Sequence, residues 1–300
     1  MTKQATDYHL IVDSLKGNLP SLPVVMNELL TVISDHDAAL YALQDLLKMD
    51  QSIYAQLLKV ANTHGNRQGR ESRITSMEEA VQTLGLEKVK RIALNTTILT
   101  LFKGVEFPSG FSLEALWLHS LGVALASALL AEELNMGGRA DQAYTCGLLH
   151  DIGKLAKCKF DQMVYADEIR ECMSQRIDCH ERESLGKHVR HDLLGSYLAR
   201  SWGISSMVET VTKWHHEEDR SKRYDIEDAK VQALVDVVYL ANVTIHHLGF
   251  GNSGHKAVKP VSKLILRRLH LKEEQYSQFK EKLSEKLEEE ADSYALFSAK

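Results

Sequence analysis

Residues 147–155, GLLHDIGKL, decide the fold prediction for this chain of 300 residues. Two leucines complete an apolar helical turn, and His150 and Asp151 then stand side by side before Gly153. Adjacent helical residues point about 100° apart, so both side chains reach one metal ion only where the helix ends or bends. We predict that Gly153 supplies that end. Lys154 follows at once, and we expect its ammonium group to contact a substrate phosphate as a point charge.

The chain around this stretch is rich in histidine, with fourteen in total. Many of them stand beside acids at expected helix ends, or in consecutive pairs, within residues 119–247. Neutral imidazole and carboxylate groups suit iron, manganese, zinc or nickel, and several converging helices can present them together. We therefore predict a site for one or two divalent transition-metal ions. The candidate ligands at this stage are His119, His150, Asp151, His191, His215 and His216.

The rest of the chain is predicted to be helical almost throughout. It holds only four prolines, and its seventeen glycines are scattered among long stretches rich in Leu, Ala, Glu and Lys. This composition excludes an all-β fold and predicts an all-α fold. Apolar periodicity and polar turns place helices at residues 22–33, 38–48, 52–62, 77–84, 86–103, 113–134, 140–156, 160–178, 181–202, 205–216, 228–247 and 274–290.

Interruptions of the helical pattern predict how these helices group. Residues 107–110, Phe-Pro-Ser-Gly, break the pattern between two helical units. We therefore predict a two-part architecture: an N-terminal helical bundle over residues 1–108 packed on a helical metal-site domain over 109–250. A C-terminal helical extension over 251–300 follows. Within the N-terminal part, Ser76 and Glu79 form a capping box that opens a helix.

Charge, cysteine usage and hydropathy narrow the class of protein. The formal net charge of -5 argues against a broad nucleic-acid surface, and the basic residues within 255–272 are expected to form a solvated helix face. The four cysteines lack zinc-ribbon or Cys-x-x-Cys spacing, which indicates reduced thiols. No signal-peptide pattern and no apolar run of about eighteen residues is visible. We predict a cytoplasmic protein that does not bind a membrane.

The order of the motifs resembles that of the HDOD proteins, which are bacterial signalling modules related to the HD phosphohydrolases and the HD-GYP cyclic-dinucleotide phosphodiesterases. The resemblance covers about residues 17–250. In the N-terminal half it rests on LPSLPVVMNELL, DQSIYAQLLKVANT and ITSMEEAVQTLGLEKVKRIAL. In the second half it rests on LWLHSLGVA, AYTCGLLHDIGKL, HDLLGSYLARSWGI, HHEE and VVYLANV.

The resemblance implies roles for the residues around the starting stretch. His119 corresponds to the first histidine ligand of the HD fold, and His150 and Asp151 correspond to its His-Asp pair. Lys154 corresponds to the lysine that follows the pair. In the complete enzymes such ligands hold metal ions that activate a water against phosphorus. Asp151 and Lys154 would then be the catalytic residues.

The downstream motifs are retained with two departures. His191 resembles the additional histidine of the HD-GYP type, and His215 and His216 resemble its paired histidines. Asn242 stands where the HD fold has its last ligand, an aspartate, so its amide oxygen can coordinate but brings no negative charge. We reject Asp236 as a substitute, because six helical residues rotate it about 120° from the face of Asn242. The Gly-Tyr-Pro segment of the cyclic-dinucleotide enzymes is absent.

Two functions are compatible with these motifs. The first is a bacterial HDOD-type signal-transduction regulator that carries an HD-phosphohydrolase-like metal site and contacts protein partners. The alternative is an active metal-dependent phosphohydrolase that acts on a phosphorylated small molecule, a nucleotide or a phosphodiester. A nucleic-acid partner is not expected. Glu217 either orients a water or is a solvent-exposed acid, and His246 and His247 are expected to cap a helix end.

Overall fold

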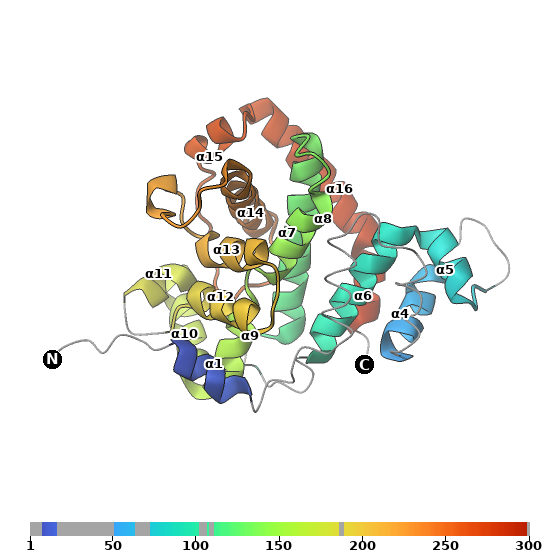
Figure 1. Cartoon of the computed structure of the whole chain (residues 1–300), viewed down its shortest axis with the longest axis horizontal. Coiled ribbons are helices and arrows are strands. Elements are labelled where there is room, and N and C mark those ends of the chain that lie inside the picture. The colour runs from blue at the N-terminus through green and yellow to red at the C-terminus, as the bar shows by residue number, and fades with distance from the viewer. Residues whose placement is uncertain are drawn as a thin grey trace. The chain divides into compact units, whose positions relative to one another are not determined.

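The computed structural model of the chain describes residues 8–16, 51–63, 73–101, 107, 111–185 and 189–298. In this part of the chain the regular structure is helical and no strand occurs (Figure 1). The all-α prediction is therefore confirmed. The helices predicted at 22–33 and 38–48 lie outside the described residues.

The chain divides into two compact units. The first comprises Met1–Leu19 and Gly104–Ser284, and the second comprises Pro20–Lys103 and Glu285–Lys300. The last helix, α16 (Glu273–Ser298), begins in the first unit and ends in the second. The linear division predicted at residues 108 and 250 stays a prediction.

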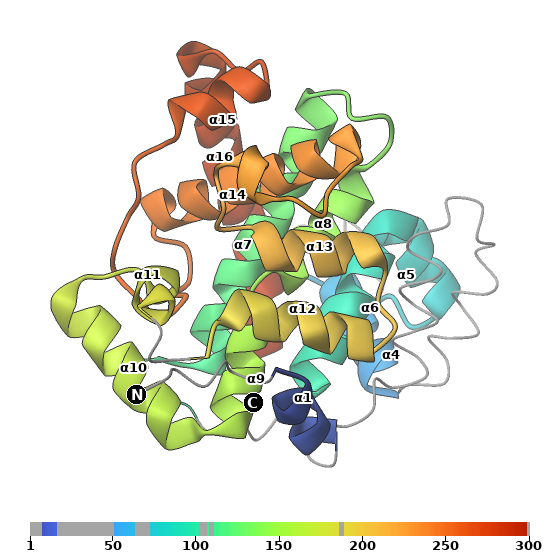
Figure 2. The ribbon, with the colours of Figure 1, turned by 60° about the vertical axis from the view of Figure 1, so that its left-hand side comes forward.

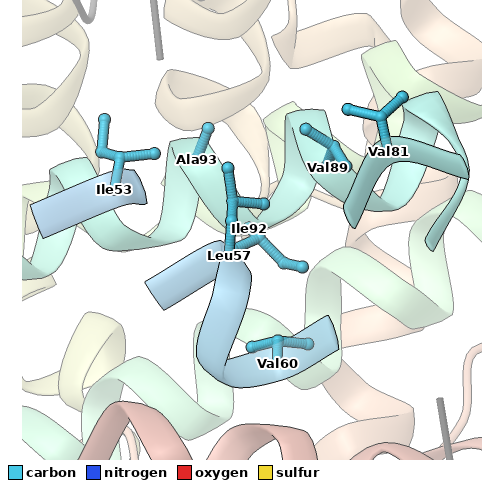
Figure 3. Packing of buried hydrophobic residues seen from close by; sticks show 7 residues of the cluster. All are labelled: Ile53, Leu57, Val60, Val81, Val89, Ile92 and Ala93. Carbon is cyan, nitrogen blue, oxygen red and sulfur yellow. The ribbon is translucent and has the colours of Figure 1, made fainter. Parts of the chain in front are cut away.

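An apolar cluster holds the helices of the second unit together. These helices are α4 (Gln51–Ala61), α5 (Met77–Leu84) and α6 (Leu86–Leu101). Full burial of one aliphatic side chain stabilises a fold by about 1.5–3 kcal/mol, so a few such residues suffice to fix three short helices. The cluster, drawn in Figure 3, consists of Ile53, Leu57, Val60, Val81, Val89, Ile92 and Ala93.

The start of α5 follows the predicted capping box with one change. The side chain of Ser76 accepts a hydrogen bond from the backbone N–H of Glu79 at 3.1 Å. The Glu79 carboxylate accepts in return from the N–H of Thr75 at 3.0 Å, one residue before the cap. Both of these backbone N–H groups at the helix start have an acceptor, and the helix begins where the sequence predicted. Gly85, with φ of 78°, ends it.

Two apolar helices form the centre of the first unit. They are α7 (Leu113–Glu133) and α14 (Ala229–Leu248), which pack against each other, while α8 (Ala140–Leu149) packs on α7. By length and hydropathy both α7 and α14 could cross a membrane, although the sequence pattern predicted no apolar run of that length. Their apolar windows are 72% and 67% buried inside the structure, as is typical of core helices in a globular unit.

Shorter helices surround this centre. The predicted helices at 140–156 and 181–202 are each divided in two, and Figure 2 shows α12 and α13 side by side. The surrounding elements are α1 (Tyr8–Lys16), α9 (Ile152–Phe160), α10 (Gln162–Gln175), α11 (Cys179–Ser184), α12 (His191–Ser201), α13 (Ser206–Trp214), the 3₁₀ turn η1 (Arg220–Lys222) and α15 (Lys263–Arg268).

Gly153 sets the distance between α9 and α12. A Cβ atom at this position would lie 1.9 Å from the carbonyl oxygen of His191 and 2.7 Å from the backbone nitrogen of Gly195. The prediction that Gly153 ends a helix is therefore wrong. The preceding helix ends at Leu149, and Gly153 lies inside α9, where the missing side chain lets two helix backbones touch.

Candidate metal centre

The break between α8 and α9 places the His-Asp pair in the interior of the first unit. His150 follows the last residue of α8, and Asp151 is the N-cap residue of α9. The two side chains therefore leave the backbone where its direction changes. Both are buried, with 0% and 2% of their surface exposed. The predicted helix break is present, although it lies before Gly153.

Histidines from three further segments meet at Asp151. His119 comes from α7, His191 is the first residue of α12, and His215 and His216 follow α13. These five histidines, counting His150, form the Asp151 cluster together with Asp151. Their ligand atoms fall into two sets, each within 4.8 Å of one another: His119, His150 and Asp151, and Asp151, His191, His215 and His216. The structure thus brings together every predicted histidine, while metal binding by them stays a prediction.

The distances describe a shell of nitrogen atoms around one carboxylate. The Nε2 atoms lie 3.9 Å (His119), 3.4 Å (His150), 3.2 Å (His191) and 3.7 Å (His215) from an oxygen of Asp151. The Nε2 of His216 lies 3.0 Å from the Nε2 of His191. Two nitrogen lone pairs at that distance repel unless a proton or a cation lies between them.

Hydrogen bonds on the far side of the rings decide which nitrogen faces Asp151 with a lone pair. The Nδ1 atoms of His150 and His215 each lie 2.7 Å from the carbonyl oxygen three residues earlier. A carbonyl only accepts, so each Nδ1 carries a proton, and in the neutral form of either ring the lone pair is then on Nε2. Nε2 of His119, His150 and His215 and Oδ1 of Asp151 are buried without a hydrogen-bond partner. Buried polar atoms rarely lack partners, so the arrangement fits a bound cation.

Burial keeps most rings of the Asp151 cluster neutral, which is the form that coordinates a metal. It lowers the pKa of His215 to about 4 and holds the pKa values of His119 and His216 well below the usual value. His191 is the exception. Burial alone would lower its pKa, but the carboxylate of Glu183, 2.7 Å from Nδ1, raises that pKa to about 9.

Lys154 is paired inside the protein rather than exposed. Its Nζ lies 2.8 Å from Oδ2 of Asp151 and 3.0 Å from the carbonyl oxygen of Ser253, and 2% of the residue is exposed. Burial alone would raise the pKa of Asp151, but His150 and Lys154 hold that pKa well below its usual range. The predicted contact of Lys154 with a substrate phosphate stays a prediction.

Asn242 lies on α14 at the edge of the cluster. It lines a small cavity together with His215, and its Oδ1 is buried without a partner. Asp236, on the same helix, is engaged elsewhere. Its Oδ2 accepts from Arg220 at 2.6 and 3.0 Å, and its Oδ1 lies 2.8 Å from Arg223. The rejection of Asp236 as a ligand agrees with this geometry.

Two histidines at the end of α14 have other contacts than the predicted cap. The ring centroid of His246 lies 4.6 Å from that of His119, and its Nε2 lies 3.2 Å from Oγ of Ser253. His247 contacts a backbone carbonyl at 2.8 Å in the following segment. The helix is capped by Gly249, with φ of 66°. The capping prediction was therefore wrong, and a periodicity argument offers no signal that places His246 beside His119.

A third set of possible ligands lies beside the cluster and shares one member with it. We call it the Asp178 triad; its ligand atoms lie within 4.8 Å of one another, and it consists of Asp178, His180 and His216. Two of its members also form ion pairs with residues outside the triad. Oδ2 of Asp178 lies 3.4 Å from Nε2 of His255, and Nε2 of His180 lies 3.4 Å from Oδ2 of Asp192. Neither His180 nor His255 lies in one of the histidine motifs of the sequence.

Two predictions outside the cluster are also resolved. The carboxylate of Glu217 accepts from the N–H of Asp219 at 2.9 Å and lies 3.7 Å from Lys222. It is thus engaged on the polar turn after the paired histidines, which favours the reading of Glu217 as an ordinary acid. The basic residues within 255–272 lie in a helix only at α15, so the predicted helix over this stretch was wrong, whereas Lys256, Lys263, Arg267 and Lys272 are exposed as expected.

Comparison with known proteins identifies relatives over most of the chain. The model of the HDOD domain matches residues 19–218. The structure is similar to an HDOD domain protein of unknown function from Geobacter sulfurreducens, with 22% identity, a TM-score of 0.74 and 96% of both chains covered. It is also similar to a putative signal transduction protein from Marinobacter aquaeolei, with 19% identity and a TM-score of 0.79 over 97% of this chain and 65% of that one. At such identities the likeness concerns the fold.

A third solved structure and two curated proteins are also similar to this chain. A putative phosphohydrolase from Shewanella amazonensis is 21% identical, with a TM-score of 0.69 over 97% of this chain and 100% of that one. An uncharacterized protein of Treponema pallidum is 23% identical over 77% of this chain and 43% of its own length. Ribonuclease Y of Mycoplasma mycoides is 28% identical over 54% of this chain and 31% of its own length. The chain spans less than half the length of these curated relatives.

Proposed function

The chain belongs to the HDOD domain family, and from that premise we propose that it is a bacterial signal-transduction regulator whose first unit binds a divalent transition-metal ion at the Asp151 cluster. One observation carries the metal part of the proposal. Buried imidazole Nε2 atoms without hydrogen-bond partners surround a buried carboxylate, and the far-side Nδ1 atoms of His150 and His215 contact backbone carbonyls. One or two cations would satisfy these atoms.

The donor set defines the class of ion. Imidazole nitrogen with one carboxylate suits iron, manganese, nickel or zinc better than magnesium or calcium, which prefer oxygen. The set with His119 and His150 would hold one ion and the set with His191 a second, with Asp151 common to both. Asn242 would add an amide oxygen. A bound ion would link α7, α12 and the α8–α9 junction, and so stabilise the native unit in proportion to its occupancy.

Burial supports a regulatory role over a hydrolytic one. Asp151 and Lys154 are each 2% exposed, and the Lys154 ammonium is held by Asp151 and the carbonyl of Ser253. A phosphate ester would have to reach both groups. In the regulator the ion acts structurally, and the signal passes through protein partners at the surface. We place this regulator in the cytoplasm, which its four free and buried cysteines support.

A metal-dependent phosphohydrolase is the second candidate. It is supported by a cavity of about 300 Å³ lined by His119, His246 and Lys256, within the size range of small-molecule sites. A bound metal would supply an activated water and polarise a phosphoryl group. Lys154 would offset charge on the phosphoryl oxygens after leaving the Ser253 carbonyl. The similarity to ribonuclease Y favours a phosphodiester among the possible substrates.

Metal analysis followed by an activity screen distinguishes the regulator from the phosphohydrolase. We expect the purified protein, loaded with Mn²⁺, Fe²⁺ or Ni²⁺, to retain one or two ions and to hydrolyse neither phosphate monoesters nor phosphodiesters. Turnover that disappears in His150→Ala would establish the phosphohydrolase instead. Failure of the loaded protein to retain any ion would contradict both functions.

A further inference from the structure

Glu183 lies behind the Asp151 cluster and binds its ligand His191 twice. Its Oε2 accepts from Nδ1 of His191 at 2.7 Å and from the backbone N–H of the same residue at 3.0 Å. The residue is 1% exposed. These two bonds fix the ring of His191 and direct its Nε2 toward Asp151, 3.2 Å away.

The other oxygen of Glu183 is fixed as firmly. Oε1 accepts from Nζ of Lys157 at 2.5 Å, and the same ammonium donates to the carboxylate of Glu168 at 2.6 and 2.8 Å. All three side chains are at most 5% exposed. Two buried carboxylates against one ammonium leave a surplus of negative charge, and the carboxylate of Glu183 is the one that contacts His191.

The Asp151 cluster itself is short of negative charge. None of its imidazole rings carries negative charge, Asn242 is a neutral amide, and the single carboxylate already contacts the ammonium of Lys154 at 2.8 Å. A divalent ion in a buried site is costly unless nearby negative charge compensates it. A carboxylate that accepts the far-side proton of a ligating histidine raises the basicity of that ligand.

We propose that Glu183 is the positioning residue of this site: it orients His191 and delivers, through that ring, the negative charge that a divalent ion needs and that Asn242 does not provide. The inference rests on the proposed metal site. Lys157 and Glu168 hold the carboxylate of Glu183 in place. Glu183 itself touches no ligand atom that faces Asp151.

Titration calorimetry of the full chain with Mn²⁺ and Zn²⁺ tests the proposal. We expect Glu183→Gln to weaken binding about 10–100-fold, as loss of outer-shell partners of metal ligands does. Glu171→Gln is the matched control. Glu171, on α10, accepts from Arg182 of α11 at 2.6 Å, so the control also removes the charge of a carboxylate that is bonded to an α11 residue. We expect the control to change affinity by less than about threefold.

A second variant separates charge from packing. Asn242→Asp adds a carboxylate to the ligand set, so we expect it to strengthen binding in the wild-type background and to recover about tenfold or more of the loss in Glu183→Gln. A purely structural role of Glu183 would not be rescued in this way. Asn242→Asp alone also tests the charge deficit if Glu183→Gln does not fold.

The outcomes are distinct. If the wild-type protein binds no ion, the proposed function fails before the inference is reached. Equal affinity of wild type and Glu183→Gln overturns the inference while leaving the metal site intact. Weakened binding without rescue, or Asn242→Asp binding no more tightly than wild type, overturns the charge role of Glu183.

Discussion

The Asp151 cluster and the Asp178 triad lie in the same unit, share His216 and contain the same residue types, yet they differ in what their ligand atoms contact. In the cluster, Nε2 atoms and a carboxylate oxygen are buried without partners. In the triad, Asp178 faces His255 and Lys259, and His180 faces Asp192. Composition and proximity therefore do not identify a metal site by themselves. Buried lone pairs without partners are the stronger indication.

The difference follows from the groups that contact each ligand residue on the side away from the possible ion. Behind the cluster, backbone carbonyls and Glu183 take up the Nδ1 protons, so the lone pairs are left to point inward. In the triad the ammonium of Lys259 lies 3.4 Å from Asp178, where a cation would have to sit. Lys154 likewise lies 2.8 Å from Oδ2 of Asp151, but Oδ1 of Asp151 and three Nε2 atoms of the cluster have no hydrogen-bond partner, and an ion at the cluster would satisfy them.

The largest expected effect separates one histidine of each set. His150→Ala removes a buried, unpartnered Nε2 from the cluster, and we expect the affinity for Mn²⁺ or Zn²⁺ to fall about 100-fold or more, at or beyond the upper end of the 10–100-fold loss typical of outer-shell partners. His180→Ala removes a ligand of the triad that is paired with Asp192, and we expect a change below about threefold. Titration calorimetry on both variants measures the contrast.

Circular dichroism of the metal-free variants is the control for folding, because His150 is fully buried and its truncation leaves a cavity. Equal losses in the two variants would show that both sets hold ions, or that neither does. A larger loss in His180→Ala would reverse the comparison, and the pairing argument would then be wrong.

A smaller effect concerns stability. Ion present at a hundredfold excess over its dissociation constant stabilises the native state by about 2.7 kcal/mol. For a unit of this size that corresponds to a fall in melting temperature of about 5–10 °C when EDTA removes the ion. We expect this shift in wild type and in His180→Ala, and no shift in His150→Ala. An unchanged wild-type melt, with the ion shown to be bound beforehand, contradicts a structural contribution of the metal.

The sequence predicted the candidate ligands of the cluster far better than the residues that hold those ligands in place. His119, the His-Asp pair and the later histidines stand in motifs whose order is visible along the chain, and the structure brings all of them together. Glu183 and Lys157 are 26 residues apart and belong to no motif, so only the packing of α9, α11 and α12 brings them into contact. Local patterns report what a residue contributes to its own helix and are silent on such contacts.

Gly153 shows the same limit for the fold. A glycine two residues after the His-Asp pair looks like a helix end, because glycine commonly occupies that position. Its actual constraint is the carbonyl of His191, 38 positions later in the sequence, which a side chain would meet at 1.9 Å. The all-α class and most helix positions follow from periodicity, whereas the helix breaks that shape the site depend on partners distant in sequence.

The smallest expected effect tests whether the triad is a structural ion network. Burial alone would raise the pKa of Asp178, but His255 and Lys259 hold that pKa below its usual range. A carboxylate with a lowered pKa stabilises the fold above its unfolded value of about 3.9 and loses that contribution as the pH falls toward the folded value. We expect Asp178→Asn to lower the free energy of unfolding by about 1–2 kcal/mol at pH 7. The amide still caps α11, so the loss reports the charge.

Urea denaturation from pH 7 to pH 3 measures this difference. The gap between wild type and Asp178→Asn should begin to narrow below about pH 4, because the carboxylate of the unfolded chain takes up a proton there while that of the folded chain stays ionised. Asp228→Asn is the matched control, since Asp228 caps α14 from an exposed position and should change stability by less than about 0.5 kcal/mol. A gap that stays constant with pH would show that the contacts of Asp178 with His255 and Lys259 are not electrostatic. A loss of metal affinity as large as that of His150→Ala would instead make Asp178 a ligand, and the contrast between the two sets would disappear.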